Sequence, residues 1–199
     1  LRCRRCALVY AYPQPRERIR RKYTDEYDLA EHFRPLARRK RVLYERRLAI
    51  LPEPAPGRDR LCDVGCGDGQ FLAVARTRGW RSFGVELNPP AARRAVELGA
   101  SVRVALSRNS MTSSGAASIT SWDVLEHSPE PRRFAERLAA LLAPGGTLAV
   151  TTLNVSSLAW WVFGMRWSLV CEDHLTYWNR LSLTTLFESL GLVIVRREV

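Results

Sequence analysis

The strongest constraint on the fold of this chain is an alternation of strand-like and helix-like segments between Arg60 and Glu198. Short runs rich in β-branched residues predict strands, and apolar residues at helical spacing predict amphipathic helices between them. The predicted strands are residues 60–65, 81–86, 101–105, 118–124, 147–152 and 192–198. The predicted helices are residues 69–78, 90–98, 130–142 and 182–190. This alternation predicts a parallel sheet covered on both faces.

A glycine-rich turn follows the first predicted strand, in the sequence Asp63-Val64-Gly65-Cys66-Gly67-Asp68-Gly69. The three glycines allow a tight turn and leave room for a ligand at the carboxyl end of the strand, where open α/β sheets bind ligands. A dinucleotide fingerprint would place its third glycine at position 70, which is Gln70. Asp63 favours a ligand with an ammonium group, because two like charges approach each other unfavourably in a buried site.

A second carboxylate, Glu86, ends the next predicted strand. In α/β folds a carboxylate at this place accepts hydrogen bonds from the ribose hydroxyls of a nucleoside. Together Asp63 and Glu86 predict a nucleoside ligand with a cationic tail and no phosphate.

Four motifs in this order resemble those of the seven-strand class I methyltransferases, which use S-adenosylmethionine. The motifs are Asp63-Val64-Gly65-Cys66-Gly67-Asp68-Gly69, Gly84-Val85-Glu86-Leu87-Asn88-Pro89, Trp122-Asp123-Val124-Leu125-Glu126-His127 and Leu142-Ala143-Pro144-Gly145-Gly146-Thr147-Leu148. The resemblance covers about residues 60–198. It implies an α/β fold with a Rossmann-like, doubly wound and mostly parallel sheet, S-adenosylmethionine as cofactor, and methyl transfer as the reaction.

The resemblance also assigns positions to the cofactor. The implied cofactor-binding residues are Asp63, Gly65, Gly67, Gly69, Glu86, Leu87, Asn88, Trp122 and Asp123. In such enzymes the glycine turn wraps the methionine part, Glu86 holds the ribose, and Leu87 and Asn88 flank the adenine. Tyr23 and Tyr27 resemble aromatic residues that cover the cofactor, although ordinary helix packing explains them equally well.

The chain departs from the family pattern in three places. No acid lies between Glu97 and Asp123 to accept the adenine amino group, so Ser107, Asn109 or a backbone carbonyl would take that role. Two alanines, at positions 116 and 117, replace the usual aromatic-acidic pair and are expected to weaken the edge of the fourth strand. The family closes its sheet with a seventh strand, and the sequence leaves open whether this chain is truncated before it.

The N-terminal part has a different composition, and we predict a boundary between residues 1–57 and 58–199. Cys3 and Cys6 form a Cys-x-x-Cys pair that resembles the second half of a zinc ribbon preceding some of these methyltransferases. A closed zinc site needs four ligands, so two free cysteines are the simpler interpretation, and we assign no metal ligands from the sequence. Apolar residues interspersed with charged ones over residues 16–51 predict a basic helical extension that is interrupted at Pro35.

The charge distribution leaves a nucleic-acid substrate as an alternative. The chain has 31 Lys and Arg against 20 Asp and Glu, and residues 1–60 hold most of the excess. Such a basic block attracts anionic partners, but it is also typical of a solvated helix face. No signal peptide and no apolar run long enough for a membrane span are visible, so the cytoplasm is the expected compartment.

Two histidines are candidate catalytic residues. His127 follows the fourth predicted strand, and His174 lies in a long segment, residues 154–179, that interrupts the alternation. A neutral imidazole can accept a proton from a nucleophile, whereas a loop-bonding or buried histidine is the alternative for each. The same segment is rich in aromatic residues, which suit a planar or apolar acceptor: Trp160, Trp161, Phe163, Trp167, Tyr177 and Trp178.

We therefore expect a methyltransferase that acts on a small-molecule acceptor through an O-, N- or C-nucleophile, with a quinone, sugar or lipid-like acceptor. Methylation of nucleic acid is the first alternative. A non-catalytic binding protein that retains the fold is the second.

Overall fold

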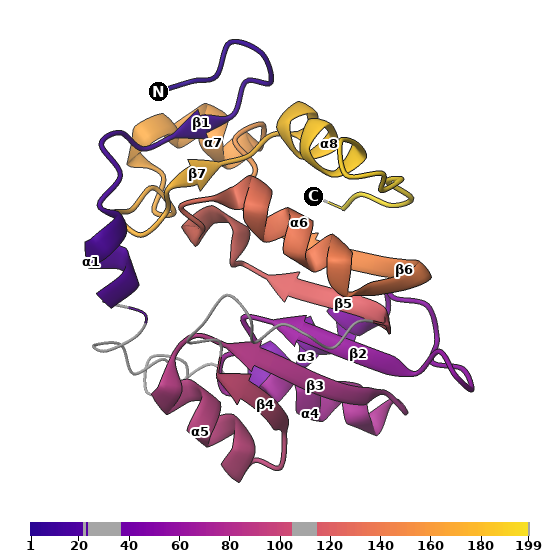
Figure 1. Cartoon of the computed structure of the whole chain (residues 1–199). Helices are drawn as coiled ribbons and strands as arrows, with labels where there is room; N and C mark the ends of the chain where they lie inside the picture. The colour runs from indigo at the N-terminus through magenta and orange to yellow at the C-terminus, as the bar shows by residue number, and fades with distance from the viewer. Residues whose placement is uncertain (22, 24–36, 105–114, 199) are drawn as a thin grey trace. The chain divides into compact units, whose positions relative to one another are not determined.

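The computed structural model describes residues 1–21, 23, 37–104 and 115–198 (Figure 1). Its contacts divide into two compact units. The sheet unit comprises Arg20–Trp122 and Ala140–Ala149, and the terminal unit comprises Leu1–Ile19, Asp123–Ala139 and Val150–Val199. The predicted boundary at residue 57 stays a prediction.

The sheet unit is built on a five-stranded sheet with the order β4-β3-β2-β5-β6. The strands are β2 (Arg60–Val64), β3 (Arg81–Glu86), β4 (Ser101–Val104), β5 (Ala116–Trp122) and β6 (Leu142–Thr151). β2 pairs in parallel with both β3 and β5, and β3 pairs in parallel with β4. The chain therefore reverses its winding direction at β2, and the carboxyl end of that strand is the switch point where such folds bind ligands.

Three helices accompany this sheet: α3 (Ala37–Leu48), α4 (Gln70–Thr77) and α5 (Pro89–Glu97). α4 packs against α3 and β3, and α5 packs against β3 and β4. The core of the unit includes Leu61 from β2, Phe71 and Leu72 from α4, and Trp122 from the end of β5, all buried. The strand and helix alternation that the sequence predicts is confirmed here, since apolar faces of both kinds meet in this core.

The terminal unit combines short elements from both ends of the chain. They are β1 (Val9–Tyr10), α1 (Arg16–Arg21), a 3-10 turn η3 (Leu125–His127), α6 (Pro131–Leu141), α7 (Leu158–Phe163), a second 3-10 turn η4 (Gly164–Arg166), β7 (Thr176–Tyr177) and α8 (Arg180–Glu188). β1 and β7 pair antiparallel, with Val9 opposite Tyr177 (Figure 1). The Asn179 side chain caps α8 and donates to the Ala7 carbonyl at 2.8 Å. These bonds join the Cys-x-x-Cys segment to the end of the chain.

The structure corrects the predicted C-terminal strand. Residues 192–198 pair with none of the described strands, and Val193 and Val195 are 84% and 87% exposed. The apolar, β-branched run Leu192-Val193-Ile194-Val195 is typical of a strand, but a strand also needs a neighbouring edge to take its backbone N–H and C=O groups.

The edges of two other strands also differ from expectation. β5 begins at Ala116, and both Ala116 and Ala117 are buried, so the alanine pair starts the strand rather than weakening it. β6 begins at Leu142, directly after α6, so it starts five residues before the strand predicted at 147. The small alanine side chains allow the start of β5 to pack closely in the interior, where Ala116 is completely buried.

Several predicted residues lie outside the described part of the chain. Tyr27, Ser107 and Asn109 are among them, so their predicted contacts with the cofactor stay predictions. Among the described helices, none is long and apolar enough to cross a membrane.

Candidate functional site

The glycine turn connects β2 to α4 at the switch point of the sheet. The Gly65 N–H donates to the Val85 carbonyl at 2.8 Å, which holds the start of the turn against β3. Gly65, Gly67 and Gly69 all have positive φ values, 81°, 55° and 76°. Such backbone angles favour glycine over any residue with a Cβ atom.

Two of these glycines have different surroundings. Among the described residues, none beyond its chain neighbours would lie within 4 Å of a Cβ atom on Gly67, so the described part of the chain leaves this side of the turn open. A Cβ atom on Gly69 would lie 2.8 Å from the Ala95 Cβ of α5. Gly67 therefore leaves room for a ligand, whereas Gly69 is required for the packing of α4 against α5.

Glu86 fastens the glycine turn to the end of β3. Its Oε2 accepts the Gly67 N–H at 2.7 Å, and its Oε1 accepts the N–H groups of Leu87 and Asn88 at 2.7 and 2.8 Å. Burial raises the pKa of this carboxyl, and the three backbone N–H groups oppose that shift. An ionised carboxylate has about four acceptor positions, so these three bonds leave capacity for a ligand hydroxyl.

Asp63 lies within β2 and is 2% exposed. The Thr120 hydroxyl of β5 donates to its Oδ1 at 2.7 Å. Burial raises the pKa of Asp63 to about 7, while the Thr120 hydrogen bond and the Arg47 charge lower it and the Glu86 charge raises it further. Burial therefore moves the pKa of this carboxyl from its ordinary acidic range toward neutral pH.

Leu87 and Asn88, predicted to flank the adenine, differ in their environments. Asn88 is completely buried, accepts the Ala91 N–H as the N-cap of α5, and donates to the Tyr23 carbonyl at 2.8 Å. Leu87 is 40% exposed and directly follows Glu86. Leu87 therefore offers apolar surface to a ligand, and Asn88 fixes the start of the helix beside it.

Trp122 ends β5 and packs edge-on against Phe71, with ring centroids 5.3 Å apart. The Arg47 guanidinium of α3 lies over the Trp122 ring, 4.9 Å from its centroid. Arg47 also lowers the pKa of Asp63. From the sequence, Arg47 is only one of the arginines of the basic N-terminal part that could bind nucleic acid, because its position over Trp122 is visible only in the structure.

Asp123 is the first residue of the second segment of the terminal unit and has a left-handed conformation, with φ 58°. Its Oδ1 accepts the Thr151 hydroxyl at 2.8 Å, and its own N–H donates to the Thr151 side chain and carbonyl. Positive φ is costly for a residue other than glycine, and it persists where surrounding bonds fix the backbone. The turn after β5 is therefore held in one conformation.

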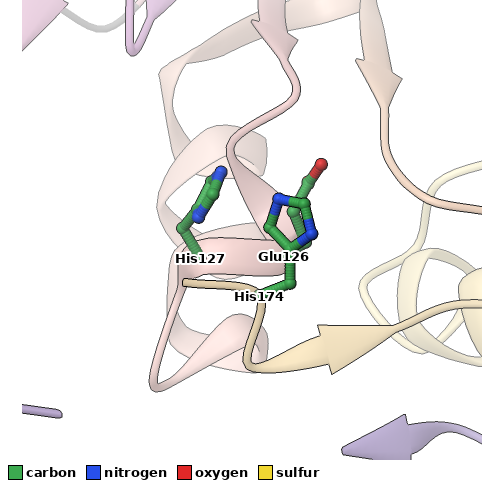
Figure 2. A group of neighbouring side chains, drawn as sticks. All are labelled: Glu126, His127 and His174. Atoms are coloured by element: carbon green, nitrogen blue, oxygen red, sulfur yellow. The ribbon is translucent and has the colours of Figure 1, made fainter. Parts of the chain in front are cut away.

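The terminal unit brings His127 and His174 together with Glu126, which the sequence analysis had quoted only as part of a motif (Figure 2). The two imidazole rings have centroids 4.7 Å apart. Glu126 is 1% exposed and accepts the Thr152 hydroxyl at 2.9 Å. Burial lowers the pKa of His127, although the Asp173 carbonyl that it contacts acts in the opposite direction.

Aromatic rings continue from this cluster through the terminal unit. The His174 and Tyr177 centroids are 6.2 Å apart, those of Tyr177 and Trp160 are 6.0 Å apart, and those of Trp160 and Trp167 are 6.3 Å apart. Trp178 is buried and donates its indole N–H to Thr176. Of the predicted aromatic residues, Trp161 and Phe163 are exposed and Trp178 belongs to the interior.

The fold and the glycine turn define an open α/β domain with a nucleoside-type site at its switch point. The methyltransferase domain model matches residues 31–197, and the chain belongs to this family. S-adenosylmethionine is the cofactor that the resemblance implies, and the open side of Gly67 and the remaining acceptor capacity of Glu86 fit it.

Two groups of relatives are similar in sequence. The chain is 30% identical over 144 residues to a ubiquinone biosynthesis O-methyltransferase of Cronobacter sakazakii, covering 67% of this chain and 58% of that protein. It is 34% identical over 116 residues to an uncharacterized methyltransferase of Mycobacterium bovis, covering 55% and 59%. The chain thus spans less than two thirds of each relative.

Solved structures share the fold at lower identity. A chain in the complex of the Haloferax volcanii Trm112 methyltransferase activator with a methyltransferase matches with a TM-score of 0.69 and 20% identity, covering 89% of this chain and 77% of that one. A SAM-dependent methyltransferase from Archaeoglobus fulgidus matches with a TM-score of 0.65 and 19% identity, covering 81% and 71%. The predicted class I methyltransferase fold is confirmed.

Proposed function

We propose that this chain methylates a hydroxyl group of a small aromatic acceptor with S-adenosylmethionine as methyl donor. The observation that carries the proposal is the position of Glu86, whose carboxylate fastens an open glycine turn at the switch point of the sheet. The relative named for O-methylation in ubiquinone biosynthesis supports a hydroxyl nucleophile and an aromatic acceptor.

In the sheet unit, the proposal assigns the cofactor to residues around this turn. Glu86 accepts the ribose hydroxyls, Leu87 contacts the adenine, and the open side of Gly67 admits the methionine part. Asp63 supplies negative charge for the ammonium group. The cofactor supplies a sulfonium methyl group, which is already electrophilic, so the main task of the protein is to hold the reactants in a near-attack arrangement.

In the terminal unit, activation of the acceptor falls to Glu126, His127 and His174, which together are called the histidine cluster. His127 lies beside His174, and its Nδ1 contacts the Asp173 carbonyl at 2.9 Å. A hydroxyl reacts faster once it has lost its proton, and assisted proton removal contributes about 10²- to 10⁴-fold to rates. The row of rings from His174 to Trp167 supports a planar acceptor, because aromatic rings prefer edge or offset contacts with one another.

Calorimetric binding of S-adenosylhomocysteine tests the cofactor assignment. In the Glu86→Gln variant, the amide N–H group faces the Gly67 N–H or the glutamine side chain turns away from it. We therefore expect this variant to bind S-adenosylhomocysteine at least about 10-fold more weakly than the wild type. Asp59→Asn is the matched control, since it also converts a carboxylate to an amide in the sheet unit but removes a partly exposed ion pair with Arg81. Equal affinity of Glu86→Gln and the wild type would contradict the assignment.

Transfer of radioactive methyl groups tests the acceptor class. We expect label in catechol and in hydroquinone, and none in transfer RNA of the same molar concentration. His127→Ala is expected to lower turnover while affinity for S-adenosylhomocysteine stays within about twofold of the wild-type value. Labelling of RNA alone would replace this proposal with the nucleic-acid alternative.

A further inference from the structure

The histidine cluster combines three side chains of the kinds that bind metal ions. One ligand atom each from Glu126, His127 and His174 lies within 4.8 Å of the other two (Figure 2). A metal ion with bonds of about 2.1 Å holds neighbouring ligand atoms about 3.0–3.4 Å apart, so modest side-chain rotations would bring all three atoms to one ion.

Backbone hydrogen bonds hold the two contributing segments together. The Leu175 N–H donates to the Glu126 carbonyl at 2.8 Å, directly after His174 in the chain. The His127 Nδ1 contacts the carbonyl of Asp173, which directly precedes His174. These two bonds hold the backbone on both sides of His174 against Glu126 and His127.

The ring contacts also determine which ring nitrogen can bind a metal ion. The His174 Nδ1 lies 2.6 Å from the Leu169 carbonyl, as the His127 Nδ1 lies near that of Asp173. A carbonyl accepts only from a protonated ring nitrogen, so in each neutral imidazole the lone pair is on Nε2. Metal-binding histidines commonly donate their other ring N–H to a carbonyl in this way.

The third residue has a comparable second contact. The Thr152 hydroxyl donates to Glu126 Oε2 at 2.9 Å, which orients this buried carboxylate. A carboxylate that binds a metal ion usually also accepts a hydrogen bond from a neighbouring group, as Glu126 does here. Two imidazoles and one carboxylate form a nitrogen-rich set that suits zinc, cobalt or iron(II), whereas magnesium prefers oxygen ligands.

We propose that Glu126, His127 and His174 bind one divalent transition-metal ion, with open positions left for the hydroxyl oxygen of the methyl acceptor. The role of the ion rests on the proposed function, but the binding does not. A coordinated hydroxyl is more acidic than a free one, so its O–H bond breaks, the proton passes to the aqueous buffer, and the oxygen stays bound to the ion as the nucleophile.

Cobalt(II) titration tests the site, because its visible absorption reports both binding and coordination. The parent protein carries Cys3→Ser and Cys6→Ser, so that no cobalt binds to the Cys-x-x-Cys pair, and is dialysed against a chelator. We expect one Co²⁺ per chain, displaced by an equal concentration of Zn²⁺ and not by Mg²⁺.

Ligand variants test whether the absorption comes from this cluster. We expect Glu126→Gln and His174→Ala each to weaken Co²⁺ binding at least about 10-fold. Glu126→Gln can keep the Thr152 hydrogen bond, and His174 is partly exposed, so both are expected to fold, which circular dichroism without metal will check. Glu172→Gln, an exposed carboxylate two residues from His174, is the control and should bind Co²⁺ like the parent.

Three results would overturn the proposal: no Co²⁺ uptake by the parent, equal uptake by folded Glu126→Gln and His174→Ala, or preference for Mg²⁺ over Zn²⁺. The titration contains neither cofactor nor acceptor. Its failure is therefore distinct from failure of the methyl-transfer assay, which tests the proposed function.

Discussion

Replacing Asp63 by asparagine should make the protein more stable at neutral and alkaline pH. Asp63 is buried within β2, and its pKa in the folded state is about 7, against an ordinary value of 3.8. Each pKa unit corresponds to about 1.4 kcal/mol, so holding this carboxylate ionised in the core costs at most about 4 kcal/mol. Asparagine keeps an oxygen that can accept the Thr120 hydroxyl and removes the charge.

The pH dependence follows from the direction of this shift. Because the folded state binds the proton more tightly than the unfolded chain, Asp63 stabilises the fold at low pH. That contribution is lost as the pH rises from about 4, where the unfolded chain ionises, through about 7, where the folded protein ionises. The asparagine variant has no such loss, so its advantage over the wild type should grow by about 3 kcal/mol between pH 5 and pH 8.

Urea unfolding followed by tryptophan fluorescence at several pH values measures this difference. Asp59→Asn is the control. The Arg81 guanidinium lowers the pKa of Asp59, so this carboxylate is ionised in both the folded and the unfolded wild-type protein between pH 5 and pH 8. Its stability relative to the wild type should therefore be independent of pH. If the Asp63→Asn difference is equally flat between pH 5 and pH 8, the argument from burial is refuted.

The Asp63→Asn variant also tests whether this carboxylate binds the cofactor, apart from its effect on stability. If the Asp63 carboxylate accepts the ammonium group of the cofactor, binding must ionise it, and about half a proton should leave the wild type at pH 7. Titration with S-adenosylhomocysteine in buffers of different ionisation enthalpy measures that release. Asp63→Asn should release none and bind more weakly, although its fold is more stable. Proton release that is equal in the two proteins would assign the titrating group elsewhere.

Two further substitutions test the packing described above. Gly69→Ala should lower the free energy of unfolding by about 2–4 kcal/mol in urea, because its Cβ would lie 2.8 Å from Ala95 at a φ of 76°; a loss below about 1 kcal/mol would mean that α4 and α5 are not in close contact. Asn179→Ala removes the cap of α8 and the bond to Ala7, and should lower thermal stability by about 1–2 kcal/mol; an unchanged midpoint would show that neither bond contributes.

Local patterns in the sequence predict the sheet unit well. The order of strand, glycine turn and helix around Gly67 depends on residues that are adjacent in the chain, and so does the placement of Glu86 at a strand end. The roles of individual glycines cannot be obtained in this way. Gly69 is distinguished from Gly67 by Ala95, which comes from α5, and only the folded structure brings these residues together.

The terminal unit depends on contacts between distant parts of the chain, and there the sequence predicts less. The strand pattern of residues 192–198 is correct in spacing, but the pattern carries no information on whether a partner edge exists. β1, only two residues long, is a strand because it pairs with β7 at the other end of the chain. A two-residue segment has no periodicity to detect, so its structure is set entirely by that partner.

The histidine cluster illustrates the same difference at the level of chemistry. The sequence indicates His127 and His174 separately, as two imidazoles that each suit proton transfer. Their meeting depends on the bonds from Leu175 to Glu126 and from His127 to Asp173, which no spacing rule contains. The Leu175 bond also brings the buried carboxylate of Glu126 beside the histidines, and the contacts of His127 with the Asp173 carbonyl and of His174 with the Leu169 carbonyl fix the two ring tautomers. Because three oriented donors converge, the cluster is better suited to hold an ion than to serve as one isolated base.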